Sequence, residues 1–253
     1  IIYGVPTMKS FTQATLANAT LGAALNTVIT AHGENMAAIA EVSKVISAQN
    51  DVVQKAFGMC FTSNPHTALS VIKKLATGGD DNSNALVQQV NKAGWNEVET
   101  LIGANLCALA KQNFRNSTIW SDAVPTLSQE SLVIELDKIA DIQQAANDAL
   151  ELSNELNLSE GSEIDLKNFK SKTITLDQLD RLHTLIAKMK IEVVNIQNKG
   201  FYAKLVNQSI KSRLVEAQKL FTSVDCELFT AKFFKNGNVE VKVKDQDIFA
   251  DFT

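Results

Sequence analysis

Residues Leu176–Val224 read LDQLDRLHTLIAKMKIEVVNIQNKGFYAKLVNQSIKSRLVEAQKLFTSV. Apolar residues recur here at alternating spacings of three and four, the pattern of a coiled-coil-like seam. One register comprises Leu179, Ile186, Val193, Gly200, Asn207, Leu214 and Phe221, and the other comprises Leu182, Met189, Ile196, Ala203, Ile210, Ala217 and Val224. A helix of this length would extend about 70 Å. The stretch therefore predicts one very long helix in an elongated, mainly α-helical bundle.

A second seam of similar length lies near the start of the chain, from Ser10 to Phe57, and its heptad phase continues through Gly33. The polar residues on this seam are His32, Asn35 and Gln49, and such residues can fix helix register at a cost in stability. We expect this helix to pair with Leu176–Val224 inside the chain. His32 is interpreted as a hydrogen-bonded layer residue rather than a ligand or a catalytic base.

The first half of this helix, Ser10–Gly33, contains no charged residue and is rich in Ala, Thr, Gly and Asn. Small residues allow helices to approach closely, and this suits either a helix buried on most sides or one that enters a bilayer. We favour the buried helix, because five threonines and two asparagines leave the stretch only weakly hydrophobic. The residues that would face neighbouring helices or lipid are Leu16, Leu21, Leu25, Val28 and Ile29.

Shorter helices are expected over His66–Ala76, from a cap at Asp80, Asp81 or Ser83 to about Arg115, and from the cap Ser128 to about Leu156. Loops are expected at Asn116–Leu127 and Asn157–Thr173. Capping boxes are predicted at Ser10 with Gln13 and at Thr175 with Gln178. Trp95 and Trp120 are expected to be core or corner anchors.

Charge is distributed unevenly between two of these helices. The helix from Ser128 carries Glu130, Glu135, Asp137, Asp141, Asp148, Glu151 and Glu155 against Lys138 alone. The Leu176–Val224 stretch has eight basic residues and four acidic ones. We expect these two helices to lie side by side, and the alternative is a solvated face without a specific partner.

The C-terminus changes character at about residue 225. Lys235-Asn236-Gly237-Asn238 separates two apolar segments, and Asn-Gly between alternating segments is the strongest short hairpin signal. The predicted domains are therefore a helical bundle over 1–224 and a β-hairpin over 225–253. A lone hairpin is marginal in water, so it must pack on the bundle or on a partner. The predicted contact residues are Phe229, Phe233, Phe234, Val239, Val241, Val243 and Phe249.

Composition excludes several classes of protein. The net charge of −4, from 24 basic and 28 acidic residues, argues against bulk binding to nucleic acid. No run of about 18 apolar residues indicates a constitutive transmembrane helix, and nothing near Ile1 resembles a signal peptide. The three cysteines, Cys60, Cys107 and Cys226, are too few and too far apart for a disulfide framework.

No motif for catalysis or for nucleotide binding is present. The spacing of Asp180 and His183 resembles half of a helical di-metal site, but no second acid-x-x-His pair completes it. We therefore predict no enzymatic activity, no metal, no cofactor and no small-molecule substrate.

The function predicted from these features is structural: a protein that assembles with itself or with partner proteins through helical faces and the hairpin. A component of a secreted, surface or viral particle fits this description. The alternative is a subunit of an α-helical pore-forming toxin that inserts a weakly apolar helix into a membrane. That alternative rests on architecture alone, and a helical enzyme is the third possibility.

Overall fold

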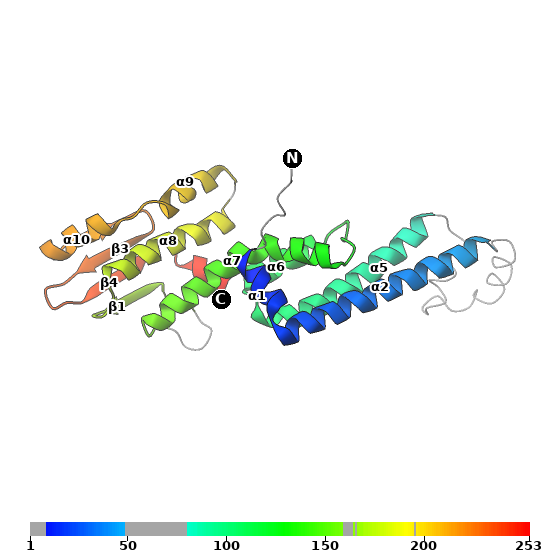
Figure 1. Ribbon diagram of the computed structural model, residues 1–253. Helices are drawn as coiled ribbons and strands as arrows, with labels where there is room; N and C mark the ends of the chain where they lie inside the picture. Colours follow the sequence, from blue (N-terminus) through cyan, green and yellow to red (C-terminus); the bar gives the residue numbers. More distant parts are fainter. Residues whose placement is uncertain (1–8, 49–79, 159–163, 165, 195) are drawn as a thin grey trace, which may run out of the picture. The chain divides into compact units, whose positions relative to one another are not determined.

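The computed structural model describes residues 9–48, 80–158, 164, 166–194 and 196–253. The predicted helix His66–Ala76, Cys60, Gln49 and the end of the first predicted long helix lie outside these residues. The described part is mainly helical, with a small antiparallel sheet near the C-terminus (Figure 1). This confirms the predicted mainly α fold with a C-terminal β-hairpin.

The described elements are α1 (Ser10–Ala17), α2 (Ala19–Ala48), α5 (Asp80–Ile102), η1 (Gly103–Asn105), α6 (Ala108–Ser117), α7 (Gln129–Glu155), β1 (Asn168–Ser171), α8 (Leu176–Val193), α9 (Ile196–Val206), α10 (Lys211–Leu220), β2 (Ser223–Asp225), β3 (Phe229–Phe233), β4 (Val239–Val243) and η2 (Asp247–Phe252). They fall into two compact units. Unit 1 comprises Ile1–Asn105 and Asn113–Lys138, and unit 2 comprises Leu106–Gln112 and Ile139–Thr253. The hairpin thus belongs to a larger unit, and the predicted boundary at residue 224 does not coincide with this division.

The first predicted long helix is interrupted at Asn18, so the prediction of one continuous helix is wrong. Asn18 has an extended backbone, and its side-chain oxygen accepts the Leu21 N–H at 2.9 Å. The residue therefore ends α1 and caps α2. A Cβ on Gly22 would lie 2.3 Å from the Leu16 carbonyl oxygen, so only glycine permits this close turn. The predicted cap at Ser10 is also wrong, because Lys9 precedes the helix and makes no side-chain cap.

The second predicted long helix is three helices, α8, α9 and α10, followed by strand β2. The capping box of Thr175 and Gln178 at its start is confirmed. The heptad count nevertheless continued through Gly200 and Asn207, which contribute no apolar side chain to a seam. Periodicity therefore overestimated the length of this helix.

Each of the two long segments packs within its own unit. In unit 1, α2 packs against α5, and in unit 2, α8 packs against α9 and α10. The predicted pairing of the two long helices stays a prediction. Gly94 allows the packing of α2 against α5, because an added Cβ would lie 2.9 Å from His32 Nδ1 and 2.8 Å from Leu127 Cδ2. Trp95 is fully buried beside them and donates to the Pro125 carbonyl, as expected of a core anchor.

The predicted contact between the acidic and basic helices is confirmed. Arg181 of α8 reaches two carboxylates of α7, Glu151 at 2.8 Å and Glu155 at 2.7 Å. Lys188 and Asp148 approach to 3.8 Å about two turns further along α8. These pairs set the orientation of two helices in unit 2 more than they add stability.

The sheet of unit 2 has the order β1-β4-β3-β2, and all neighbouring strands are antiparallel. The hairpin β3–β4 turns at Gly237, whose φ of 81° is the left-handed conformation that glycine favours. Strand β1 lies in the predicted loop Asn157–Thr173, so that part of the prediction is wrong. Helices α8 and α10 lie along the sheet (Figure 1), and His183 of α8 packs edge-on against Phe229 of β3.

Candidate functional site

The residues predicted for contact through the hairpin lie mostly in the core of unit 2. The buried ones are Phe229, Phe233, Val239, Val241, Val243 and Phe249, none more than 4% exposed. Phe234 is half-buried and lies beneath the ammonium groups of Lys170 and Lys232. Because β1 and β2 pair with the outer sides of the hairpin, its side chains and edges are occupied within the chain.

The residues predicted to face helices or lipid belong to α1 and α2. Leu25 is fully buried, whereas Leu16, Leu21, Val28 and Ile29 are half-buried. Among the described residues, no helix is both long and apolar enough to cross a membrane. The pore-forming alternative itself stays an untested prediction.

Helix α9 presents two of the exposed large apolar residues of unit 2. Ile196 is 87% exposed and Phe201 is 52% exposed, while Leu205 is the only buried residue of this helix. Phe201 stacks edge-on against its neighbour Tyr202. Residues 193–215 contain Lys199, Lys204, Lys211 and Arg213 but no acidic residue. The result is a basic, partly aromatic helix that packs on α8 through one side and leaves Ile196 and Phe201 exposed on the rest of its surface.

Unit 1 contains a groove of about 500 Å³ between α2 and α5. Its apolar walls include Val28, Ile39, Val90 and Ala93, and Glu97 lies on its rim. His32 lines the same groove. Glu34 borders a smaller adjoining hollow that shares Ala31 with the groove. Among the residues that the structure describes, no lysine or arginine lines either hollow.

His32 is buried in unit 1, but the hydrogen bond predicted for this layer residue is missing at Nε2. Burial lowers the pKa of its imidazole, and the neighbouring Asn91 amide partly offsets this effect. The contact between His32 and Asn91 is not a well-formed hydrogen bond, because His32 Nε2 and both polar atoms of the Asn91 side chain make no hydrogen bond. Trp120, by contrast, is 59% exposed beneath Arg115, so its prediction as an anchor is wrong.

The C-terminus of α10 carries an exposed aromatic residue in an unusual backbone conformation. Phe221 has φ 52° and ψ 43°, is 50% exposed, and donates its N–H to Gln218 while Thr222 donates to Ala217. These bonds form a Schellman motif with phenylalanine at the position that glycine usually occupies. The neighbouring Leu220 is 63% exposed. The fold itself does not require this side chain.

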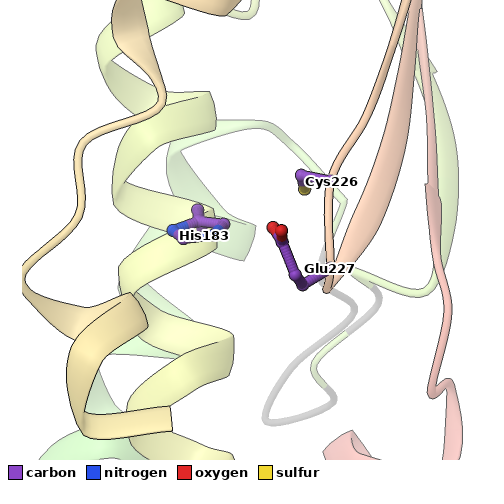
Figure 2. Close-up of side chains that lie close together, drawn as sticks. All are labelled: His183, Cys226 and Glu227. Atoms are coloured by element: carbon purple, nitrogen blue, oxygen red, sulfur yellow. The ribbon is translucent and has the colours of Figure 1, made fainter. Parts of the chain in front are cut away.

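Three potential metal ligands meet in unit 2 between α8 and the turn from β2 to β3. His183, Cys226 and Glu227 each offer a ligand atom, and these atoms all lie within 4.8 Å of one another. Figure 2 shows the Glu227 carboxylate directed from the turn toward the His183 ring, with Cys226 beside it. His183 is fully buried and neither ring nitrogen has a hydrogen-bond partner, Cys226 is 3% exposed, and Glu227 is exposed.

The protonation of these groups follows from burial and nearby charges. Burial lowers the pKa of His183; the carboxylates of Glu227 and Asp180 oppose this shift, and Arg213 adds to it. Burial also raises the pKa of the Cys226 thiol, and this thiol donates to the Phe229 carbonyl at 3.0 Å. The site thus holds a neutral imidazole and a neutral thiol at ordinary pH.

From the sequence, the residue considered as a metal ligand together with His183 was Asp180, and the structure gives Asp180 a different role. Asp180 instead accepts the Ile210 N–H at 2.7 Å and the Ser209 hydroxyl, and so caps the start of α10. Cys226 and Glu227 lie more than 40 residues further along the chain, and only the packing of α8 on the sheet brings them to His183. No local motif signals that meeting.

Comparison of the chain with protein-family models, with curated proteins and with solved structures finds no match.

Proposed function

We propose that this protein is a non-enzymatic, self-assembling interaction protein, in which α9 of one copy docks into the α2–α5 groove of a second copy. The observation that carries the proposal is that one chain has both an exposed basic helix, in unit 2, and an apolar groove with an acidic residue at its edge, in unit 1. Helix-in-groove binding of this kind is a recurrent mode of recognition.

The apolar part of the contact comes from Ile196 and Phe201. These residues are five positions apart, which is about 140° around a helix. A helix that lies flat on a membrane needs its apolar residues on one face. Apolar residues on more than one side instead suit a helix that is flanked by two walls, as the groove between α2 and α5 provides.

The charged part of the contact opposes Lys199 and Lys204 of one copy to Glu34 and Glu97 of the other. Such complementarity contributes to specificity and to the rate of association. It also argues against α9 pairing with α9 of another copy, since that arrangement would bring lysines together. The favoured contact therefore joins two different surfaces.

A contact between two different surfaces is heterologous, and unless the rotation between copies closes a ring it generates open chains. Each copy has one helix and one groove, so growth continues with concentration. This property suits a component of an ordered particle, as the sequence predicts.

Charge reversal in the purified chain tests the proposal. We expect Lys199→Glu/Lys204→Glu and Glu34→Lys/Glu97→Lys each to remain monomeric, where the unchanged protein grows in mass with concentration in low salt. An equimolar mixture of the two variants should associate again, because each presents the charge that the other lacks. Sedimentation velocity with light scattering measures the mass.

Lys219→Glu/Lys235→Glu changes the net charge as much as the α9 variant does, at exposed lysines elsewhere in unit 2. This control should assemble normally. A strict monomer at all concentrations for the unchanged protein would rule the proposal out. So would binding of that monomer, through Lys199 and Lys204, to vesicles containing phosphatidylserine, because α9 would then serve a membrane surface.

A further inference from the structure

We propose that His183, Cys226 and Glu227 form a binding site for a single zinc ion, with water as the fourth ligand. This site is separate from the surfaces used in the proposed assembly. It adds a metal to a chain for which the sequence alone predicts none.

The first argument is the condition of His183. Burial of an imidazole with neither nitrogen hydrogen-bonded is destabilising, because the ring loses its hydration without compensation. His183 is fully buried with both nitrogens unpartnered, and its ring packs 6.4 Å from Phe229. An apolar residue would fill this position in the core at lower cost. Coordination of a metal gives one ring nitrogen a partner and gives the residue a function.

The second argument is the chemistry of the three donors. Nitrogen, sulfur and carboxylate oxygen form the mixed set that zinc binds in four-coordinate sites. Zinc holds these atoms at about 2.0 to 2.3 Å, so two ligands of one tetrahedral ion lie about 3.3 to 3.8 Å apart. Without an ion the three ligand atoms lie within 4.8 Å of one another, so binding requires them to move together by up to about 1 to 1.5 Å. Rotation of the exposed Glu227 side chain supplies part of this movement, and small shifts of His183 and Cys226 supply the rest.

The third argument concerns charge. The Cys226 thiol loses its proton to solvent when it binds zinc, so Cys226 and Glu227 together bring two negative charges to a divalent cation. Arg213 and Lys244 are opposing positive charges nearby. The Arg213 guanidinium donates to the Asp225 carbonyl at 2.7 Å, and the Lys244 ammonium pairs with the Asp225 carboxylate at 2.8 Å, so both cations have partners. Asp180 adds a negative charge on the same side of α8. The surrounding charges thus favour a cation once the thiol is deprotonated.

The same three residue types could suggest a cysteine nucleophile with a histidine base. Burial argues against that chemistry, because Cys226 is 3% exposed and donates its hydrogen to a backbone carbonyl. A reactive cysteine needs access to substrate and a lowered pKa. A metal ligand needs neither, since the ion itself displaces the thiol proton.

Cobalt(II) titration of the intact, metal-stripped chain tests the site, because thiolate-bound cobalt has a charge-transfer band and an intense tetrahedral visible spectrum. We expect one cobalt per chain, displaced by zinc. Cys226→Ser should abolish the thiolate band, and His183→Leu should weaken binding at least about a hundredfold, more than the loss of an outer-shell partner. Glu227→Gln should weaken binding while keeping the band.

Cys107→Ser and Cys60→Ser are the matched controls. Cys107 is the other cysteine of unit 2 and is also buried without a disulfide. Both variants should retain the spectrum and the stoichiometry. Absence of a thiolate band in the unchanged protein, or a band that survives Cys226→Ser, would overturn the proposal.

Thermal unfolding gives a second readout that does not depend on spectroscopy. Zinc at about a hundred times its dissociation constant should raise the midpoint of the unchanged protein by about 5 °C or more. In chelator, His183→Leu should melt above the unchanged protein, and zinc should reverse that order. A variant that melts higher with and without zinc would identify His183 as a buried polar residue without a ligand.

Discussion

Units 1 and 2 both depart from ordinary packing, but for different reasons. In unit 1 one irregular residue is Gly94, and its missing side chain makes room for His32 and Leu127. In unit 2 two irregular residues are His183, which is buried without a partner, and Phe221, which is exposed with a positive φ. Packing therefore requires Gly94, whereas His183 and Phe221 are kept at a cost in stability. Replacement of Gly94 should destabilise the protein, and replacement of His183 or Phe221 should stabilise it.

The largest expected effect is at Gly94. Gly94→Val should destabilise the protein by about 2 to 3 kcal/mol, because overpacking forces His32 and Leu127 to move. Denaturant unfolding measures the change. Gly200→Val on α9 is the control, since an added Cβ there meets no atom within 4 Å, and it should change stability by no more than about 0.5 kcal/mol. Equal losses at both glycines would contradict the role assigned to Gly94.

The opposite sign is expected at Phe221. Phe221→Gly should stabilise the protein by about 1 kcal/mol, because glycine adopts the left-handed conformation without a steric penalty. Asn157 ends α7 in the same motif with φ 56°, and asparagine tolerates this conformation. Asn157→Gly should therefore have a smaller effect in the same unfolding experiment. Destabilisation by Phe221→Gly would mean that the aromatic side chain supports the fold.

Lowering the pH should reduce the folding stability of the protein through the buried His32 of unit 1. The pKa of His32 is lowered in the folded state from 6.5, so the unfolded chain binds its proton first as the pH falls. The stability that depends on neutral His32 is therefore fully present above about pH 6.5 and is lost as the pH falls below that value. In chelator, His32→Leu should lose less stability than the unchanged protein between neutral pH and about pH 5. Identical pH profiles would show that His32 does not contribute to the loss.

The smallest effect is expected at the exposed ion pairs of unit 2. Arg181→Ala removes contacts with Glu151 and Glu155, and should cost about 0.5 kcal/mol at low salt and less at high salt. The pKa of Glu155 is lowered by its hydrogen bonds from Gln178 and Arg181, so it should rise in the variant when followed by carboxyl NMR. No change in that titration would contradict the pairing.

Sequence patterns predicted the local features well. The capping box at Thr175, the hairpin turn at Gly237 and the facing charges of α7 and α8 each depend on residues close in the chain or on a strong bias of composition. The ends of long helices were predicted poorly. Asn18 and Asn207 lie within apparently continuous heptads, and the competing cap at Asn18 is stronger than the periodicity that spans it.

The candidate sites were harder to predict, because they depend on which elements pack together. Phe229 and Val241 have the aromatic and β-branched character of contact residues, yet they fill the core under α8 and α10. Burial of the hairpin could not be separated from contact with a partner until β1 was known to pair with it. The same limit applies to His183, because the helix and the turn that surround it are distant in sequence.

The position of β4 in the sheet has a consequence for the order of folding. β4 lies between β1 and β3, although β1 precedes it by about 70 residues in the chain. The hairpin β3–β4 closes a short loop and forms quickly, whereas the pairing of Phe169 with Val241 closes a long one. We therefore expect β1 to join after β2, β3 and β4 have paired. During that interval the free side of β4 is an open edge where another newly made chain can pair.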